Sequence, residues 1–391
     1  MAIAIESFTV LLTLAGLAYL LLALWGARDF NQFWRRRGRN EGIAPDVSIL
    51  KPVKGLDQSM YAGLVSHCKQ TYAGNFEIVF GVSSLYDPAV VEIERLQEEF
   101  PECTIRLVEC SDRLGTSGKV SNLVQMIREA RYSYVLINDS DIHVSPQYLT
   151  RVMTCFSDAH VGMVTAPYIG RTAASGVGRT VWSRLEALGI STEFLPGVLT
   201  ARKVEGGIRF GLGSTLAMSR KALEAAGGLE PLLECLADDF EMGARIAAAG
   251  YTVELCNEVV ETTVPAYGLR GFWEHQLRWA RSTRDSRKLG YIGVGITYAL
   301  PWAVLTCVAS GFELWSFTLL SVVLLARVAV ALSVGVGVLQ DEQVLRDLWL
   351  LPVRDFLGLL IWIWSFAGDT VMWRGTLFHL KDGNITPVQE S

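Results

Sequence analysis

The sequence has little charge. Only 19% of its 391 residues are charged, whereas soluble globular proteins carry about 25%. Half of the residues are apolar, and the formal net charge is −5. Such a composition excludes an intrinsically disordered chain, and it provides no overall basic field for nucleic acid. We therefore expect no nucleic-acid partner, and we expect part of the chain to lie in lipid.

The sequence also lacks the usual cysteine patterns. Its seven cysteines are scattered, and no Cys-x-x-Cys pair occurs among them. This excludes a disulfide framework and a structural zinc site of the common spacing, and it is typical of reduced cytosolic thiols.

The apolar residues concentrate at the two ends. Ser7 to Gly26 carries no charge and is long enough as a helix to cross about 30 Å of hydrocarbon. Arg28, Arg35–Arg37 and Arg39 follow it, so the positive-inside rule predicts an outward N-terminus and a cytoplasmic continuation. A cleaved signal peptide is the alternative, but no basic residue precedes the run and no Ala-x-Ala site follows.

The C-terminal part contains three further apolar runs. Tyr291–Gly311 and Leu314–Leu339 predict a hairpin of membrane helices around Glu313. Phe356–Gly368 is too short to span alone. It is expected either to span with an internal ion pair of Arg354 and Asp355, or to be re-entrant or interfacial.

These runs predict three regions. Residues 1–34 form an N-terminal transmembrane anchor, residues 35–289 a cytoplasmic catalytic domain, and residues 290–391 a membrane region with two or three transmembrane or re-entrant helices. The middle region has ordinary composition from Pro45 to Lys288 and is long enough to bury its own core.

Short apolar runs alternate with helical patterns in the middle region, which predicts a doubly wound, mostly parallel α/β sheet. Strands are expected at Val47–Leu50, Glu77–Val82, Thr104–Val108 and Tyr134–Ile137, and helices at Pro88–Phe100, Val120–Ala130 and Phe240–Ala249. Such sheets bind ligands at the carboxyl ends of their strands.

Two carboxylates follow the most apolar strand. Asp139 and Asp141 are two residues apart, so on an extended chain their side chains point the same way and can face one site. Mg²⁺ and Mn²⁺ are commonly held by one or two carboxylates together with substrate phosphates. An ordinary turn is the alternative, since Asp and Ser are common in turns.

Other polar residues also lie near expected element ends. Asp87 precedes Pro88 and fits a helix cap. Lys119 follows a Gly-Thr-Ser-Gly loop that can meet phosphate at a helix N-terminus, although the glycine spacing is not that of a Walker A loop. Asp238 and Asp239 open a helix, where the macrodipole favours acids; they are equally a source of a general base.

The last motif precedes the C-terminal apolar runs. His275, Arg278 and Trp279 provide a hydrogen-bond donor, a guanidinium fork and a flat indole. Basic and aromatic residues at a membrane interface are a compatible interpretation.

Together these motifs resemble the family-2-like inverting glycosyltransferases, and most closely the ceramide glucosyltransferase group, which includes bacterial enzymes that glycosylate hopanoid lipids. Three segments carry the likeness: Lys51-Pro-Val-Lys-Gly-Leu-Asp57, Gly118-Lys-Val-Ser-Asn122 and Leu236-Ala-Asp-Asp-Phe240. One departure is His275, where the family usually has Gln or Arg.

The resemblance implies a GT-A-type, Rossmann-like nucleotide-sugar domain. It implies that Asp87 binds the uridine of a UDP-sugar and that Lys51, Pro52 and Lys119 contact the donor. Asp139 and Asp141 would hold the diphosphate through Mg²⁺ or Mn²⁺, and Asp239 would be the base. The remaining roles fall to His275, Arg278 and Trp279, which would close on the diphosphate and acceptor.

A membrane lipid, either ceramide or a hopanoid, is the expected acceptor, and the bacterial inner membrane is the expected location. Gly170–Gly207 has little clear helix or strand pattern and is interpreted as an amphipathic acceptor entrance, with core packing as the alternative. Gly211–Thr215 is expected to allow close approach of a sugar. No obligate protein partner is inferred. A processive polysaccharide synthase and an inactive scaffold of the same fold are the competing hypotheses.

Overall fold

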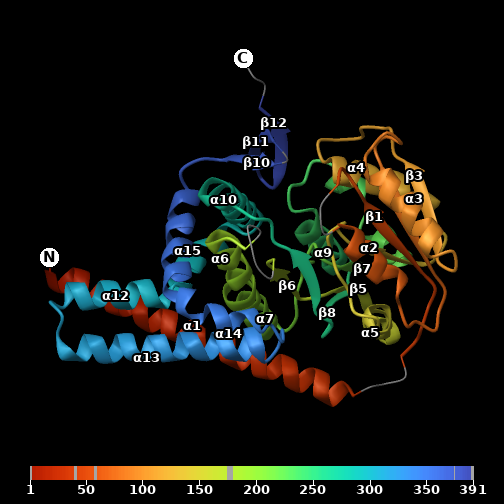
Figure 1. Ribbon diagram of the computed structural model, residues 1–391. Helices are drawn as coiled ribbons and strands as arrows, with labels where there is room; N and C mark the ends of the chain where they lie inside the picture. Colours follow the sequence, from red (N-terminus) through yellow and green to blue (C-terminus); the bar gives the residue numbers. More distant parts are fainter. Residues whose placement is uncertain (1, 39–41, 57–59, 174–178, 374, 389–391) are drawn as a thin grey trace.

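The computed structural model describes residues 2–38, 42–56, 60–173, 179–373 and 375–388. Its centre is a seven-stranded sheet of order β3-β2-β1-β4-β7-β5-β8 (Figure 1). The strands are β1 (Val47–Pro52), β2 (Phe76–Val82), β3 (Thr104–Glu109), β4 (Tyr134–Ile137), β5 (Val161–Thr165), β7 (Leu216–Ser219) and β8 (Thr252–Leu255). All neighbouring pairs are parallel except those of β7, which is antiparallel to β4 and β5. The predicted mostly parallel sheet is confirmed, and β4 is its middle strand.

Helices cover both faces of this sheet because side chains alternate along each strand. Ile49 and Ile78 contribute to one core with α2, α3 and α5, whereas Leu50 and Val79 face the other core with α4 and α9. These helices are α2 (Met60–Cys68), α3 (Ala89–Glu99), α4 (Gly118–Glu129), α5 (Tyr148–Thr154), α8 (Arg220–Ala225) and α9 (Asp238–Ala248). On α3 the core side chains include Val90, whereas the next residue, Val91, is 66% exposed.

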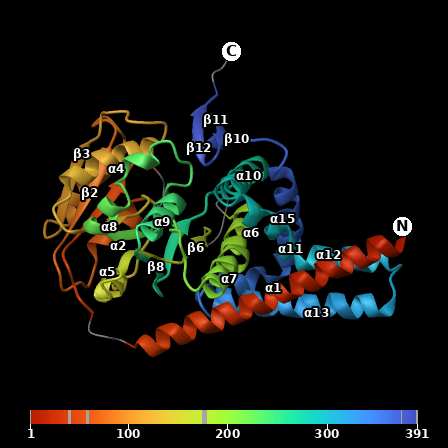
Figure 2. The same cartoon turned by 180° about the vertical axis from the view of Figure 1, so that it is seen from behind.

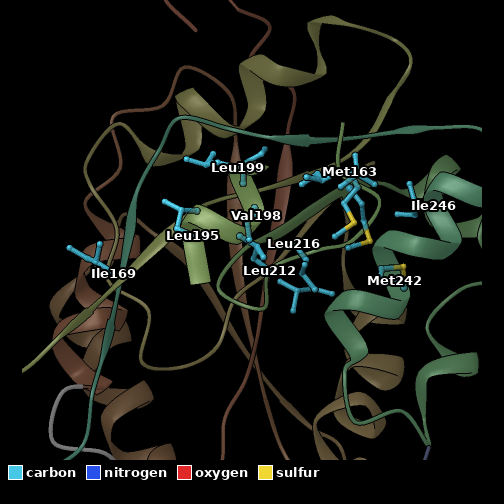
Figure 3. Close-up of a cluster of buried hydrophobic side chains, with 14 of the residues drawn as sticks. Met163, Ile169, Leu195, Val198, Leu199, Leu212, Leu216, Met242 and Ile246 are labelled. Carbon is cyan, nitrogen blue, oxygen red and sulfur yellow. The ribbon is translucent and has the colours of Figure 1, made fainter. Parts of the chain in front are cut away.

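The segment from 168 to 205, which has little pattern in the sequence, is ordered and largely helical where the structure describes it. It contains β6 (Tyr168–Arg171), α6 (Val181–Gly189), a π-helical turn (Ile190–Phe194) and α7 (Leu195–Glu205). A capping box between Thr180 and Ser183 starts α6. Side chains of α7 and α9 belong to one core, with Met163, Leu212 and Leu216 between them (Figure 3). The core-packing alternative is therefore correct for its buried residues. The ring of Phe194, by contrast, is 37% exposed.

The N-terminal helix α1 (Ala2–Arg37) is longer than its predicted apolar run. Its 36 residues span about 54 Å, well beyond the roughly 30 Å of a bilayer core. The second half packs along α7 (Figure 2). Asp29 there accepts hydrogen bonds from Arg202 at 3.0 Å and Lys203 at 2.7 Å. The second half of this helix is thus fixed directly to α7.

The C-terminal half contains a set of apolar helices, of which α12 and α13 lie beside α1 (Figures 1 and 2). The helices are α10 (Leu269–Ser286), α11 (Lys288–Thr297), α12 (Ala299–Ala309), α13 (Leu314–Val330), a π-helical turn (Ala331–Val336), α14 (Gln343–Asp347) and α15 (Leu351–Ser365). Within the described residues, three helices are long and apolar enough to cross a membrane, or up to four if the bent pair of α11 and α12 is one span.

Two expectations for this region need correction. The run Tyr291–Gly311 is not one straight helix, because α11 and α12 meet at 56°. Arg354 and Asp355 do not pair with each other. Asp355 instead accepts hydrogen bonds from Arg327 of α13 at 2.8 and 2.9 Å, and Arg354 pairs with Glu193 at 2.9 Å. Neighbouring residues on a helix point about 100° apart, so each charge reaches a different element.

A small antiparallel sheet follows α15, where sequence patterns predict only membrane helices. It comprises β10 (Thr370–Trp373), β11 (Thr376–Lys381) and β12 (Asn384–Pro387). Asp382 and Gly383 connect β11 and β12 with positive φ angles of 50° and 81°, which defines a tight hairpin turn. The sheet lies between α10 and the catalytic domain in both views (Figures 1 and 2).

Candidate active site

The carboxylate loop after β4 is held by two lysines. Lys51, buried at the end of β1, donates to the backbone oxygen of Asp139 at 3.0 Å. Burial lowers the pKa of Lys51 to about 7, against the opposing effect of Asp141 and Asp139. Lys119, in the first turn of α4, lies 2.9 Å from Oδ1 of Asp139. Lys51 in the last two residues of β1 and Lys119 in the first turn of α4 thus meet at the same edge of the sheet.

Lys119 also connects this loop to the start of α9. Its Nζ lies 3.2 Å from Oδ2 of Asp238. Burial alone would lower the pKa of Lys119, but Asp139 and Asp238 overcome that effect and raise it. The ammonium therefore stays charged between the two acidic segments.

Asp239 faces the same space. Burial, followed by the neighbouring charge of Asp238, raises the pKa of Asp239 to about 6, although Lys119 opposes the shift. A Cβ atom at Gly213 would lie 3.1 Å from Oδ2 of Asp239 and 3.9 Å from Oδ2 of Asp139. Gly213 thus leaves open the space between the two carboxylates. Gly213 of the segment Gly211–Thr215 therefore lies close to these two acids. The approach of this segment to a sugar stays a prediction.

Asp141 is oriented by a residue that the sequence did not single out. Thr262 of β9 (Val260–Thr263) donates to Oδ2 of Asp141 at 2.6 Å. Burial and then Asp139 raise the pKa of Asp141, while the Thr262 hydrogen bond lowers it. The two carboxylates of this loop therefore repel each other.

The donor set fits a divalent cation only in part. In the region that the structure describes, no group of three or more His, Cys, Asp or Glu side chains converges. Asp139 and Asp141 provide two oxygen ligands, and a cation would relieve the repulsion between them. Mg²⁺ and Mn²⁺ accept such a pair when phosphate oxygens or water complete the shell.

Asp87 lies apart from these acids, on a neighbouring cavity of about 450 Å³. Both of its oxygens accept from the backbone N–H of Gly55, at 2.9 and 3.2 Å, and one also accepts from Ala89. The helix-capping interpretation is thereby supported. Lys54, Arg113 and Gly118 line the same cavity, which places it beside the first turn of α4.

The first motif segment of the sequence is described only up to Leu56. Pro52 ends β1 opposite Gly81. Gly55 has a φ of +71°, a conformation that favours glycine and turns its N–H toward Asp87. Asp57 lies outside the described residues.

His275 on α10 has a buried partner that sequence reasoning missed. Glu186 of α6, which is 3% exposed, accepts from Nδ1 of His275 at 2.9 Å and from Gln276 at 3.3 Å. The imidazole also lies between the rings of Tyr267 and Trp279, with centroids 5.5 and 4.7 Å away. The sequence signal that could have identified Glu186 is its position as an acid between the apolar residues Leu185 and Leu188.

The pKa values of Tyr168 and Tyr267 respond both to Glu186, the partner of His275, and to the carboxylates after β4. Burial and the charges of Asp239, Glu186 and Asp139 raise the pKa of Tyr168. Burial also raises the pKa of Tyr267; Glu186 and Asp141 raise it further, and Arg278 lowers it. Asp139 and Asp239 border a common space at Gly213, and His275 stacks on Tyr267, whereas Asp87 borders the adjacent cavity.

This combination of sheet, acidic loop and flanking cations is that of a GT-A-like fold. The mannosyltransferase from Pyrobaculum calidifontis, solved with GDP-Man and Mn²⁺, shares the fold with a TM-score of 0.51 and 19% identity, over 92% of this chain and 99% of that one.

The family follows from the sequence comparison. The glycosyl transferase family 21 model matches residues 8–386, and the chain belongs to that family. It is 23% identical to ceramide glucosyltransferase 3 of Caenorhabditis elegans over 89% of this chain and 76% of that protein. It is 24% identical to an N-acetylglucosaminyltransferase of Bradyrhizobium diazoefficiens over 68% of this chain and 54% of that protein. The resemblance read from the motifs is confirmed.

Proposed function

We propose that this glycosyltransferase moves a sugar from a UDP-sugar to the hydroxyl of a membrane lipid, with inversion at the anomeric carbon. The observation that carries the proposal is Asp239, a carboxylate with a pKa raised to about 6 that faces Asp139 across Gly213. A base of this strength is unprotonated at neutral pH and still accepts a proton from an attacking hydroxyl.

The chain's own residues account for the remaining steps. Asp239 removes the proton as the acceptor oxygen attacks, and a single displacement inverts the carbon. Lys119, Arg278 and the His275–Glu186 pair surround the space for the leaving diphosphate, where negative charge grows. Asp87, Lys54 and Arg113 border the cavity assigned to the nucleoside. Lys51 fixes the backbone of Asp139.

Mg²⁺ or Mn²⁺ would be held by Asp139 and Asp141, and it would supply charge neutralisation at the diphosphate. The Pyrobaculum mannosyltransferase, which shares the fold, was solved with Mn²⁺, and this supports a metal-dependent donor site. In this chain Lys119 already neutralises Asp139 in part. The cation and Lys119 would then share that carboxylate.

The exposed apolar residues support a lipid acceptor. On α15 and the turn before it, Trp349, Val353, Phe356, Leu360 and Ile363 are each at least 39% exposed and recur at helical spacing. The opposite face buries Arg354, Asp355 and Gly358. A helix with one such apolar stripe suits the membrane interface. We therefore place α15 at the interface, where it contacts α6.

The proposed location is the cytoplasmic face of a bacterial inner membrane. Arg35 and Arg36 are exposed at the end of α1, where positive residues favour the cytoplasmic side. The relatives favour two donors, since one is named a glucosyltransferase and another an N-acetylglucosaminyltransferase.

The test is transfer by the purified protein in lipid nanodiscs. UDP-glucose and UDP-N-acetylglucosamine are each offered with ceramide or a polyol hopanoid, with Mn²⁺ or with EDTA. Asp239→Asn should abolish transfer and keep UDP affinity within about twofold, because the base acts only on the acceptor. Glu241→Gln, on the same helix and paired with Arg245, is the matched control. Loss of UDP binding in Asp239→Asn would instead assign this residue to the metal site.

A further inference from the structure

The C-terminal sheet is attached to both halves of the site. On one side, Arg281 of α10 donates to the backbone oxygens of Ala367, at 3.1 Å, and Thr370. Asp285, near the end of α10, accepts from the N–H of Gly383 at 2.8 Å. Lys288 pairs with Asp382 at 2.6 Å. The Asp382–Gly383 turn thus docks on the helix that carries His275 and Arg278.

The same turn docks on the loop that leads into α9. The oxygen of Gly383 accepts from the N–H of Leu236 at 3.0 Å, and Ile385 donates to the oxygen of Glu234 at 2.8 Å. Leu236 is buried with four side chains of the C-terminal sheet. They are Val371, Phe378, Leu380 and Ile385. The docked loop ends two residues before Asp238.

That loop also contacts the segment before Lys119. Thr116 donates to Oε1 of Glu234 at 3.1 Å, and Ser117 donates to the oxygen of Leu233 at 2.8 Å. A Cβ atom at Gly115 would lie 2.7 Å from Cβ of Leu233, so the two segments touch. Residues 233–236 therefore join the Lys119 segment, the Asp239 helix and the C-terminal sheet.

We propose that residues 370–373 and 375–387 form a positioning strap, which fixes the distance between the α10 motif and α9, the helix that carries Asp239. Asp285 and the turn Asp382–Gly383 are its positioning residues. Because the charges and proton of the reaction must be placed to within about 1 Å, a strap that links both elements affects turnover more than donor affinity. This inference rests on the proposed function, in which Asp239 and α10 act on one substrate.

The first test removes one attachment. Asp285→Ala deletes the acceptor for the Gly383 N–H, whereas Asp285→Asn retains an acceptor oxygen and is the matched control. We expect kcat to fall about tenfold in Asp285→Ala, with UDP affinity within twofold of wild type, and Asp285→Asn to lie close to wild type. A folded Asp285→Ala protein with kcat within twofold of wild type would overturn the proposal.

The second test concerns the other attachment, between the strap and the loop before α9, and restores it by a cross-link. Cys235 and Asn384 are opposite each other in an antiparallel bridge, a spacing that suits a disulfide. In the Leu236→Ala/Asn384→Cys protein, which lacks the Leu236 packing against the C-terminal sheet, kcat should be low while the thiols are reduced, and oxidation should recover most of it. Cys235→Ser in the same background should abolish that rescue. Reversible inactivation of the single variant Asn384→Cys by oxidation would contradict a permanently docked strap.

The two proposals fail in different ways. If the wild-type protein transfers no sugar from either donor, the proposed function fails. The strap is then tested by hydrogen exchange of the backbone amides. Faster exchange of amides 234–239 in Asp285→Ala than in Asp285→Asn supports the strap without any activity. Equal exchange in the two variants contradicts it.

Discussion

Asp239 gives the site a pH dependence that an exposed aspartate would not. Its pKa is raised to about 6 because of burial and the adjacent Asp238, so the carboxyl keeps its proton up to that pH. We expect kcat/KM to be constant above about pH 7 and to fall about tenfold per pH unit below 6, since only the deprotonated form accepts the acceptor proton. A profile that stays flat down to pH 5 would exclude Asp239 as the base.

Glu186 offers a second prediction for a single residue. Replacement by leucine leaves the N–H groups of His275 and Gln276 without their shared acceptor, and unpaired buried donors are unfavourable. We expect kcat/KM to fall about tenfold through misorientation of His275, with UDP affinity retained. Glu274→Gln on α10, which removes a more exposed pair with Arg270, serves as the control. Equal effects of the two variants would contradict a role for Glu186 in the site.

Gly213 can be tested by one added methyl group. The Cβ of Gly213→Ala would lie 3.1 Å from Oδ2 of Asp239, which is closer than ordinary carbon–oxygen contact. We expect transfer to fall at least tenfold while the thermal unfolding midpoint stays near wild type, because the methyl group enters the open space of the site. A fully active Gly213→Ala enzyme would show that the acceptor hydroxyl does not enter the space between Asp139 and Asp239.

At the scale of elements, α13 and α15 are held together by a buried pair. Arg327 and Asp355 are 5% and 3% exposed. Asp355→Asn leaves a buried guanidinium without its charge partner and should lower the free energy of unfolding by about 3–5 kcal/mol. The double variant Arg327→Met/Asp355→Leu should recover most of that loss. Thermal unfolding in detergent checks both, and a double variant no more stable than Asp355→Asn would contradict the explanation.

The strands and helices around the donor side could be predicted because their patterns are local. β4 is an uninterrupted apolar run, and α4 shows helical spacing, so Asp139 and Lys119 fall at strand and helix ends as expected. Glu186 could not be placed, since its partner His275 lies 89 residues away and only tertiary packing brings α6 to α10. The bend between α11 and α12 does have a local cause, because Pro301 hinders the backbone carbonyl of Thr297 four residues earlier.

The C-terminal sheet was missed for a different reason. Asp382-Gly383 is a recognisable hairpin signal between short alternating stretches, but the apolar runs before it dominate the composition of the region. An isolated three-stranded sheet of this size is marginal in water. Its stability comes from Leu236 and α10, which are distant in sequence.

At the scale of the whole molecule, orientation in the membrane is open to direct measurement. We expect residues at the start of α1 to face outward and the sheet to face the cytoplasm. Ser7→Cys and Glu98→Cys, each placed in a Cys103→Ser/Cys235→Ser background, provide one reporter on either side. An impermeant maleimide should label only the first in intact spheroplasts. Labelling of Glu98→Cys alone would reverse the topology.

Under the proposed function, the unbroken helix α1 fixes the distance between the active site and the membrane. Its apolar half and the half clamped by Asp29 to α7 are one rigid rod, so the height of the base above the hydrocarbon is a constant of the molecule. Under the proposed function, the enzyme would select acceptors by the distance between their hydroxyl and their hydrocarbon part. Two lipids with the same headgroup chemistry but different reach would then be very unequal substrates.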